Sequence, residues 1–514
     1  MMSEKLFKST AVVSVMTFLS RILGFLRDIV IARMFGAGIG ADVFFVAFKI
    51  PNFLRRLFAE GAFSQAFIPV LAEYKNSPDQ SLKNLIAETS GTLGGILLFI
   101  TAIGMLAAPL LIMLFAPGFL EDPIKYELST QLLMITFPYI FFISLTALAG
   151  SILNSFGKFA VPAVTPVFLN ISLITSAVFL APRMQEPVTA LAWGVFIGGI
   201  VQLLFQIPFL MKMKLLTLPK WGWKSEGVRK ITRLMIPAMF GVSVAQINLL
   251  LDTLLASFLV TGSISWLYYS DRLVEFPLGV FGIALSTVIL PSLSSKHSSK
   301  STEAFSDTID WALRWVFLIG TPATIGLIYL AEPLLMTLFQ YGEFSTTDAH
   351  MASLSLMAYG LGLLPFILIK VLAPGYYARQ DTKTPVKIGI IAMVSNMGLN
   401  IILMIYLQHV GLALATALSA MLNARLLYSG LIKRSVYSPG HGWLMFMSRL
   451  LLANAGLLAA LIFVSPTQAE WIIWDAWQRA GHLLGLIVMA AIVYFSLLWC
   501  LRVNIKSLVR PINR

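Results

Sequence analysis

The sequence has 514 residues, of which 58% are hydrophobic and only 12% are charged, and its mean hydropathy is +0.84. Soluble proteins carry about 25% charged residues, so this composition excludes an ordinary soluble domain and predicts an all-α protein that crosses a membrane many times. We attribute the net charge of +13 to basic loops that set membrane orientation, rather than to a nucleic-acid-binding surface. A single cysteine, Cys500, excludes an intramolecular disulfide framework, and five scattered histidines argue against a catalytic metal site.

Fourteen apolar segments are long enough to cross a bilayer, which takes about 20 residues. In chain order they cover residues 10–34, 41–70, 88–116, 128–155, 160–181, 188–211, 233–260, 264–293, 308–331, 350–374, 385–407, 411–431, 443–465 and 482–502. The second and eighth segments contain charges and proline. When both are counted as spans, basic loops alternate along the chain with loops that are short or acidic. The basic loops and both termini are then predicted to be cytoplasmic. The first segment runs through Arg21 without a small-residue cleavage site, which favours an uncleaved helix over a signal peptide.

An internal repeat crosses the long basic loop 212–233. The stretch "FLRDIVIARMFGAGIGADVFF" (25–45) aligns without gaps to "LLLDTLLASFLVTGSISWLYY" (249–269), and Asp28 falls on Asp252. The offset spans six segments, an even number, so both copies have the same orientation and form a parallel repeat. The sequence therefore predicts a first lobe over 1–215, a second over 216–435, and two further helices with a cytoplasmic tail over 436–514.

Charged residues are concentrated in the first, second and eighth segments. At 100° per residue, Ser20, Arg21, Gly24, Arg27 and Asp28 share an arc of about 120° on the first helix. Arg33 lies on the opposite side near the end of that helix, where it can snorkel to the headgroups. Charges at membrane depth are costly and usually mark a pathway or a site.

The second and eighth segments repeat this design. Their polar arcs contain Asp42, Lys49, Asn52, Arg56 and Glu60, with Arg55 beside them, and then Ser265, Asp271, Arg272 and Glu275. We expect the three segments to line one arginine-rich cavity that binds a phosphate or pyrophosphate, because the guanidinium group grips such anions in bidentate fashion. The carboxylates would orient the arginines. Two alternatives remain open, namely ion pairs that only fix helix packing and a proton relay, although no histidine lies in these segments.

Enzyme motifs are absent from the sequence. There is no P-loop, no nucleophile elbow and no HExxH. The glycine-rich "GAGIG" (36–40) is predicted to be a tight turn between two spans. The tryptophan cluster "WIIWDAW" (471–477), between the last two segments, is predicted to be an interfacial anchor.

Four long stretches resemble a known family. "SRILGFLRD", "ADVFFVAFKIPNFLRRLFAEGAFSQAFIPVLAEY", "SWLYYSDRLVEFPLGVFGIALSTVILPSLS" and "VLAPGYYARQDTKTPVKI" resemble the MurJ (MviN) family of bacterial lipid II flippases, which belongs to the multidrug/oligosaccharidyl-lipid/polysaccharide exporter superfamily. The resemblance covers essentially the whole chain. It implies two six-helix lobes plus two C-terminal helices, and a transporter rather than an enzyme, located in the inner membrane.

The resemblance also implies a substrate and a set of residues. The family moves lipid II, an undecaprenyl pyrophosphate bearing a peptidoglycan precursor, from the cytoplasmic to the periplasmic leaflet. Cavity arginines of the family match Arg21, Arg27, Arg55 and Arg272, and further cavity positions match Asp42, Lys49, Asn52, Ser265 and Glu275. The two C-terminal helices would form a hydrophobic groove for the lipid tail.

Energy coupling and partners are expectations of the same kind. The family is linked to the membrane potential, and some members carry a sodium site, for which Asp252, Asn396 and Asn400 are weak candidates. No cofactor is expected. The partners would be lipid II, membrane lipids and the cell-wall synthesis machinery. Two alternative functions remain, a flippase for another isoprenoid-linked glycan and a cation-coupled multidrug exporter, although the arginine excess argues against the exporter.

Overall fold

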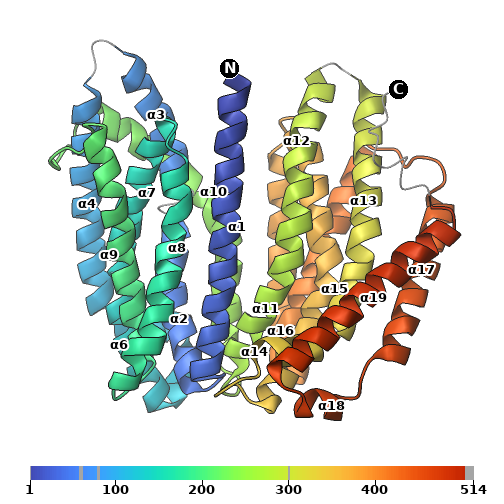
Figure 1. Ribbon diagram of the computed structural model, residues 1–514. Helices are drawn as coiled ribbons and strands as arrows, with labels where there is room; N and C mark the ends of the chain where they lie inside the picture. Colours follow the sequence, from blue (N-terminus) through green and yellow to red (C-terminus); the bar gives the residue numbers. More distant parts are fainter. Residues whose placement is uncertain (1, 57–61, 78–80, 299–300, 504–514) are drawn as a thin grey trace. The chain divides into compact units, whose positions relative to one another are not determined.

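The computed structural model describes residues 2–56, 62–77, 81–298 and 301–503. Every regular element in these ranges is helical, so the predicted all-α class is confirmed (Figure 1). Nine helices in the described ranges are long and apolar enough to cross a membrane. The chain is therefore a multi-pass helical protein, and the count of fourteen spans stays a prediction.

The chain divides into two compact units, Met1–Ser265 and Trp266–Arg514. The lobe boundaries expected from the basic loop and the repeat, 1–215, 216–435 and 436–514, stay a prediction.

The first unit holds ten α-helices and the start of the next (Figure 1). They are α1 (Met2–Phe35), α2 (Ile39–Arg55), α3 (Ser64–Asn76), α4 (Leu82–Leu106), α5 (Ala108–Phe115), α6 (Pro123–Thr136), α7 (Tyr139–Ser155), α8 (Ala160–Thr175), α9 (Thr189–Lys212) and α10 (Glu226–Ala256). Helix α1 packs against α8, α8 against α9, and α2 against α6. Phe67, Leu71, Leu85 and Ile152 from α3, α4 and α7 form part of the buried apolar core of this unit.

The second unit continues with nine helices, of which the first begins just before the boundary. They are α11 (Ser263–Pro277), α12 (Ile283–Ser298), α13 (Thr302–Tyr329), α14 (Ala331–Phe339), α15 (Thr346–Tyr377), α16 (Lys383–Lys433), α17 (Trp443–Val464), α18 (Gln468–Ile473) and α19 (Ala476–Cys500). Helix α15 packs against α13 and α16, and the last long helices, α17 and α19, pack against each other.

The order of elements supports the predicted repeat. A long helix (α1, α10) leads into a pair of shorter helices (α2–α3, α11–α12), and a π-helical turn (Leu278–Gly282) connects the second pair. Next comes a long helix followed by a short one, Leu82–Leu106 with Ala108–Phe115 and Thr302–Tyr329 with Ala331–Phe339. The turns before α2 and α11 each contain a glycine with positive φ, Gly36 at 61° and Gly262 at 98°. The "GAGIG" segment is thus a tight turn, as predicted.

Two predicted spans, 385–407 and 411–431, lie within α16, which is interrupted at Gln408. That residue has φ 50° and ψ −129°, a conformation that does not continue a helix. The break falls in the "QHVG" stretch that separates the two predicted spans, so the interruption there is confirmed.

Near the C-terminus, polar side chains cap the start of α19 and form hydrogen bonds between helices. Asp475 accepts from the Gln478 amide and Gln478 bonds back to the Asp475 amide, a capping box that starts α19. In the same helix Arg479 is only 6% exposed. Its guanidinium donates to carbonyl oxygens at the ends of α14 and α18, those of Met336, Gln340, Trp471 and Ile472. A buried cation thus satisfies the last carbonyls of two helices and joins them to a third.

Candidate functional site

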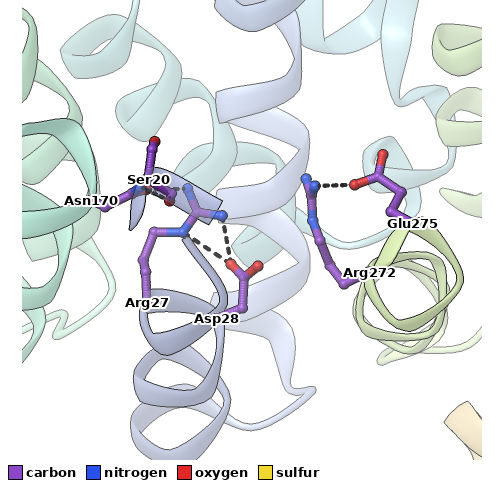
Figure 2. Close-up of polar contacts among 6 residues, drawn as sticks. All are labelled: Ser20, Arg27, Asp28, Asn170, Arg272 and Glu275. Atoms are coloured by element: carbon purple, nitrogen blue, oxygen red, sulfur yellow. Dashed lines mark hydrogen bonds and ion pairs between the residues drawn. The ribbon is translucent and has the colours of Figure 1, made fainter. Parts of the chain in front are cut away.

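The polar face of α1 packs against a single asparagine of α8. The Arg27 guanidinium donates from Nε and Nη2 to Asp28 Oδ1 over 2.9 and 2.6 Å, and from Nη1 to Asn170 Oδ1 over 3.0 Å (Figure 2). Asn170 Nδ2 in turn donates to the Ser20 carbonyl oxygen over 3.2 Å. A Cβ placed on Gly24 would meet the Asn170 amide at 3.6 Å, so the glycine faces this contact.

This cluster fixes the direction of the arginine. The Asp28 side chain is 2% exposed and the Arg27 side chain 12% exposed, so the pair lies in a largely dehydrated environment. Charged hydrogen bonds strengthen when water is excluded, and a guanidinium held by two partners loses little further freedom when it binds an anion. Arg21, on the same predicted arc, is exposed instead.

Asp42 of α2 is buried and caps the start of α11. Its carboxylate accepts hydrogen bonds from the Gly262 amide (2.6 Å), the Ser265 amide (2.9 Å) and the Ser265 hydroxyl (2.6 Å). The two amides belong to the unpaired N–H groups of a helix N-terminus, which a carboxylate satisfies well. The structure therefore brings Asp42 and Ser265 together, with their polar groups bonded to each other.

The second half of α2 carries the other predicted residues. Arg55 Nε donates to Asn52 Oδ1 over 2.9 Å, and Arg56 Nη1 donates to Gln246 Oε1 of α10 over 3.4 Å. Lys49 is half-buried on the same helix. Glu60 lies outside the described residues.

In the second unit, α11 carries Asp271, Arg272 and Glu275. Arg272 Nη1 pairs with Glu275 Oε2 at 2.6 Å, where the two side chains are 32% and 50% exposed (Figure 2). The Arg272 guanidinium also lies over the Tyr268 ring, 4.8 Å from its centroid, a cation–π contact that orients the group. Asp271 is half-buried.

The predicted sodium ligands lie in different units. Asn396 and Asn400 are buried together on α16, where Asn400 Nδ2 donates to Asn396 Oδ1 over 3.0 Å. Asp252 lies on α10 of the first unit. Within the described residues no group of three or more His, Cys, Asp or Glu side chains could hold a metal ion. Sodium coupling stays a prediction.

Sequence reasoning missed three partners, which are Asn170, Gln246 and the ring of Tyr268. Asn170 stands alone in the apolar stretch "VFLNISL" (167–173), and a lone amide in such a stretch was the available signal. Arg27 and Asn170 are 143 positions apart, so helix wheels of the separate segments could not pair them.

The chemistry of these residues suits an anion. Arg21, Arg27, Arg55 and Arg56 in the first unit and Arg272 in the second supply planar donor groups that match phosphate oxygens. The ion pairs Arg27–Asp28 and Arg272–Glu275 also fit the alternative in which charges only fix helix packing.

Comparison with known proteins gives a consistent result. The family model described as "Lipid II flippase MurJ" matches residues 31–479. The chain is 54% identical over 514 residues to the "Probable lipid II flippase MurJ" of Vibrio cholerae, covering 98% of each chain. It is 42% identical over 501 residues to the "Lipid II flippase MurJ" of Burkholderia cenocepacia, covering 96% of this chain and 97% of that one.

Solved structures agree with the sequence comparison. A structure described as "Lipid II flippase MurJ, inward closed conformation" matches with a TM-score of 0.81 and 28% identity, covering 97% of this chain and 99% of that one. An inward-facing multidrug resistance MATE family transporter matches with a TM-score of 0.68 over 83% of this chain and 98% of that one. Its identity is only 14%, so this second likeness concerns the fold alone.

Proposed function

Because this chain belongs to the lipid II flippase MurJ family, we propose that it moves lipid II from the cytoplasmic to the periplasmic leaflet of the inner membrane. The observation that carries the proposal is the 54% identity to a probable lipid II flippase of this family over 98% of both chains. As a flippase the protein is a transporter and not an enzyme, and its role lies in peptidoglycan and cell-wall synthesis. Both termini would be cytoplasmic, as the basic loops indicate.

The arginines are proposed to bind the pyrophosphate of the substrate. Arg27 is already oriented by Asp28 and Asn170, so binding costs little side-chain entropy. Arg272 lies over the Tyr268 ring and pairs with Glu275, and the side chains of Arg272 and Glu275 are partly exposed. A diphosphate can take the place of Glu275 on Arg272 at modest cost, because an exposed ion pair contributes only about 0–1 kcal/mol.

Transport would follow an alternating-access cycle. The pyrophosphate must bind one conformation more tightly than the other, since tight binding to both conformations shifts neither population. A membrane potential would add about 2.3 kcal/mol per charge per 100 mV. An inside-negative potential favours either outward movement of the anionic headgroup or inward return of an unloaded, cationic site.

The two other functions are less well supported. A flippase for another isoprenoid-linked glycan would share the diphosphate chemistry, but the relatives at 54% and 42% identity are named lipid II flippases. A cation-coupled multidrug exporter has only the fold-level likeness at 14% identity in its favour.

Depletion of the protein in a conditional strain tests the proposal. We expect lipid II to accumulate and to lose its accessibility from outside the cell, and a plasmid copy of this chain to restore that accessibility. Normal external lipid II after depletion would overturn the function. In the same strain Arg272→Ala and Arg272→Lys should both fail to complement if a bidentate guanidinium is needed. Lys433→Gln, an exposed basic residue, serves as the expression-matched control.

A further inference from the structure

A cavity of about 350 Å³ lies at one end of the second unit, apart from the residues discussed above. It lies where the α12–α13, α15–α16 and α16–α17 connections meet. Its basic lining residues are Lys296 and His297 at the end of α12, Arg379 just after α15, and Arg434 just after α16. These connections belong to the basic loops that the sequence assigns to the cytoplasm.

The polar lining suits a phosphate group. Three hydroxyl side chains, those of Ser301, Thr302 and Ser435, line the cavity together with the basic groups, and no carboxylate is among the described lining residues. Guanidinium, ammonium and hydroxyl groups are the donors that proteins use for phosphate oxygens. Lys296, Arg379 and Arg434 carry like charges, and an anion bound among them would reduce their mutual repulsion.

One carboxylate, that of Asp381, pairs with a lining arginine but is not itself a lining residue. Asp381 Oδ2 accepts from Arg434 Nη1 over 2.6 Å, but the Asp381 carboxylate is also bonded to the Thr384 amide and hydroxyl. Arg434 stays 51% exposed in spite of this pair, and its ring contact with Tyr376 at 6.0 Å orients it. Lys296 donates to the Thr308 hydroxyl of α13, which holds the ammonium group at the lining. Among the described residues no ion pair involves Arg379.

We propose that this cavity is a phosphate-binding site, which takes either the headgroup phosphate of an anionic lipid or a free phosphate. Tyr377 and Ile432, which precede the lining residues Arg379 and Arg434 by two positions each, are exposed apolar side chains. Exposed apolar groups beside basic ones are typical of a surface at the level of lipid headgroups. They favour the lipid as the source of the phosphate.

The test compares two double variants with equal loss of charge. Lys296→Gln with Arg379→Gln removes two lining cations, and Lys383→Gln with Lys433→Gln removes two exposed cations that do not line the cavity. The full chain is placed in phosphatidylcholine nanodiscs with an increasing fraction of phosphatidylglycerol, and bound phosphatidylglycerol is counted by native mass spectrometry. A parallel arm measures binding of radiolabelled inorganic phosphate to the protein in detergent without added lipid.

Each basic side chain near an anionic headgroup strengthens binding about fivefold, so the cavity variant should lose at least about tenfold in affinity and the control less than about twofold. A loss in the phosphatidylglycerol arm alone identifies a lipid headgroup, and a loss in the inorganic phosphate arm identifies a free phosphate. Equal affinities of the two double variants in both arms would overturn the proposal. Gel filtration and circular dichroism check folding, and Arg379→Gln alone, at an exposed position, replaces the double variant if the latter does not fold.

Discussion

The paired charges on α1 allow a substitution that separates substrate binding from helix packing. Replacing Arg27 by Met and Asp28 by Leu together removes both charges. Methionine is close to arginine in volume, and leucine has the branched skeleton of aspartate with larger methyl groups in place of the oxygens. If the pair only fixes packing, this apolar pair should serve equally well. If Arg27 binds the pyrophosphate, the double variant should be folded but inactive.

The contacts set the size of the effect on stability. Asp28 Oδ1 accepts two of the Arg27 N–H groups in an environment where the two side chains are 12% and 2% exposed. Asp28→Leu alone leaves the cation without this carboxylate and should cost about 3–5 kcal/mol. In the double variant the Arg27–Asn170 hydrogen bond is lost without replacement, at a cost of about 1–3 kcal/mol, while the Asn170–Ser20 bond remains. Relief from charge desolvation offsets much of that loss, so stability should stay within about 2 kcal/mol of the natural chain.

Two measurements check this prediction. Thermal unfolding in detergent should rank the double variant near the natural chain and the single Asp28→Leu variant well below it. Complementation of a depleted strain should fail for the double variant at normal expression. Arg33→Met removes an exposed arginine from the same helix, and we expect that control to complement. Full complementation by the double variant would refute substrate binding by Arg27 and leave packing as its role.

Three further predictions concern other described contacts. Asp42→Ala removes the cap of α11 and should lower the free energy of unfolding by about 1–2 kcal/mol. Ser265→Ala deletes only one hydroxyl and should lower it less. Equal thermal midpoints of the two variants would contradict the capping role. Arg479→Met leaves carbonyls at the ends of α14 and α18 unpaired and should cost about 2–4 kcal/mol, with faster amide exchange in α18; unchanged exchange would contradict this. Hydrogen bonds from Thr384, together with the bond from Arg434, lower the pKa of the Asp381 carboxyl in the folded chain. The ionised carboxylate therefore stabilises the fold at pH values above its pKa in the unfolded chain. This contribution is lost as the pH falls through its lower pKa in the folded chain. Unfolding midpoints measured across acidic pH should fall less steeply for Asp381→Asn, and superimposable profiles would argue against the assignment.

Much of the fold followed from the sequence because hydropathy and charge are local properties. The predicted span 350–374 lies within α15, and the break between 385–407 and 411–431 falls at Gln408. The repeat was visible in a gapless match, and both of its turns contain a glycine with positive φ, Gly36 and Gly262, although the match does not align these two positions with each other. The short helices α14 and α18 were not predicted, since neither is long enough to give a spanning signal.

The site was predicted in part. Helix wheels placed Arg27 and Asp28 on one polar face, and the structure puts that face against α8. They could not show that Asp42 is bonded to the start of α11, because that contact joins atoms 220 and 223 residues apart. Nor could they separate the exposed Arg21 from the buried neighbour Asp28 on the same arc.

The sequence by itself determined the membrane class, the all-helical fold, the internal repeat and the concentration of arginine in three segments. Each of these depends on the order of side chains along the chain. The bilayer requires long apolar helices, and the 3.6-residue period determines which side chains share a helix face. Only the tertiary structure decided which polar group meets which, as in Arg27 with Asn170 and Asp42 with Ser265. Such pairs are set by how distant helices pack, and helix packing depends on the shapes of both surfaces at once.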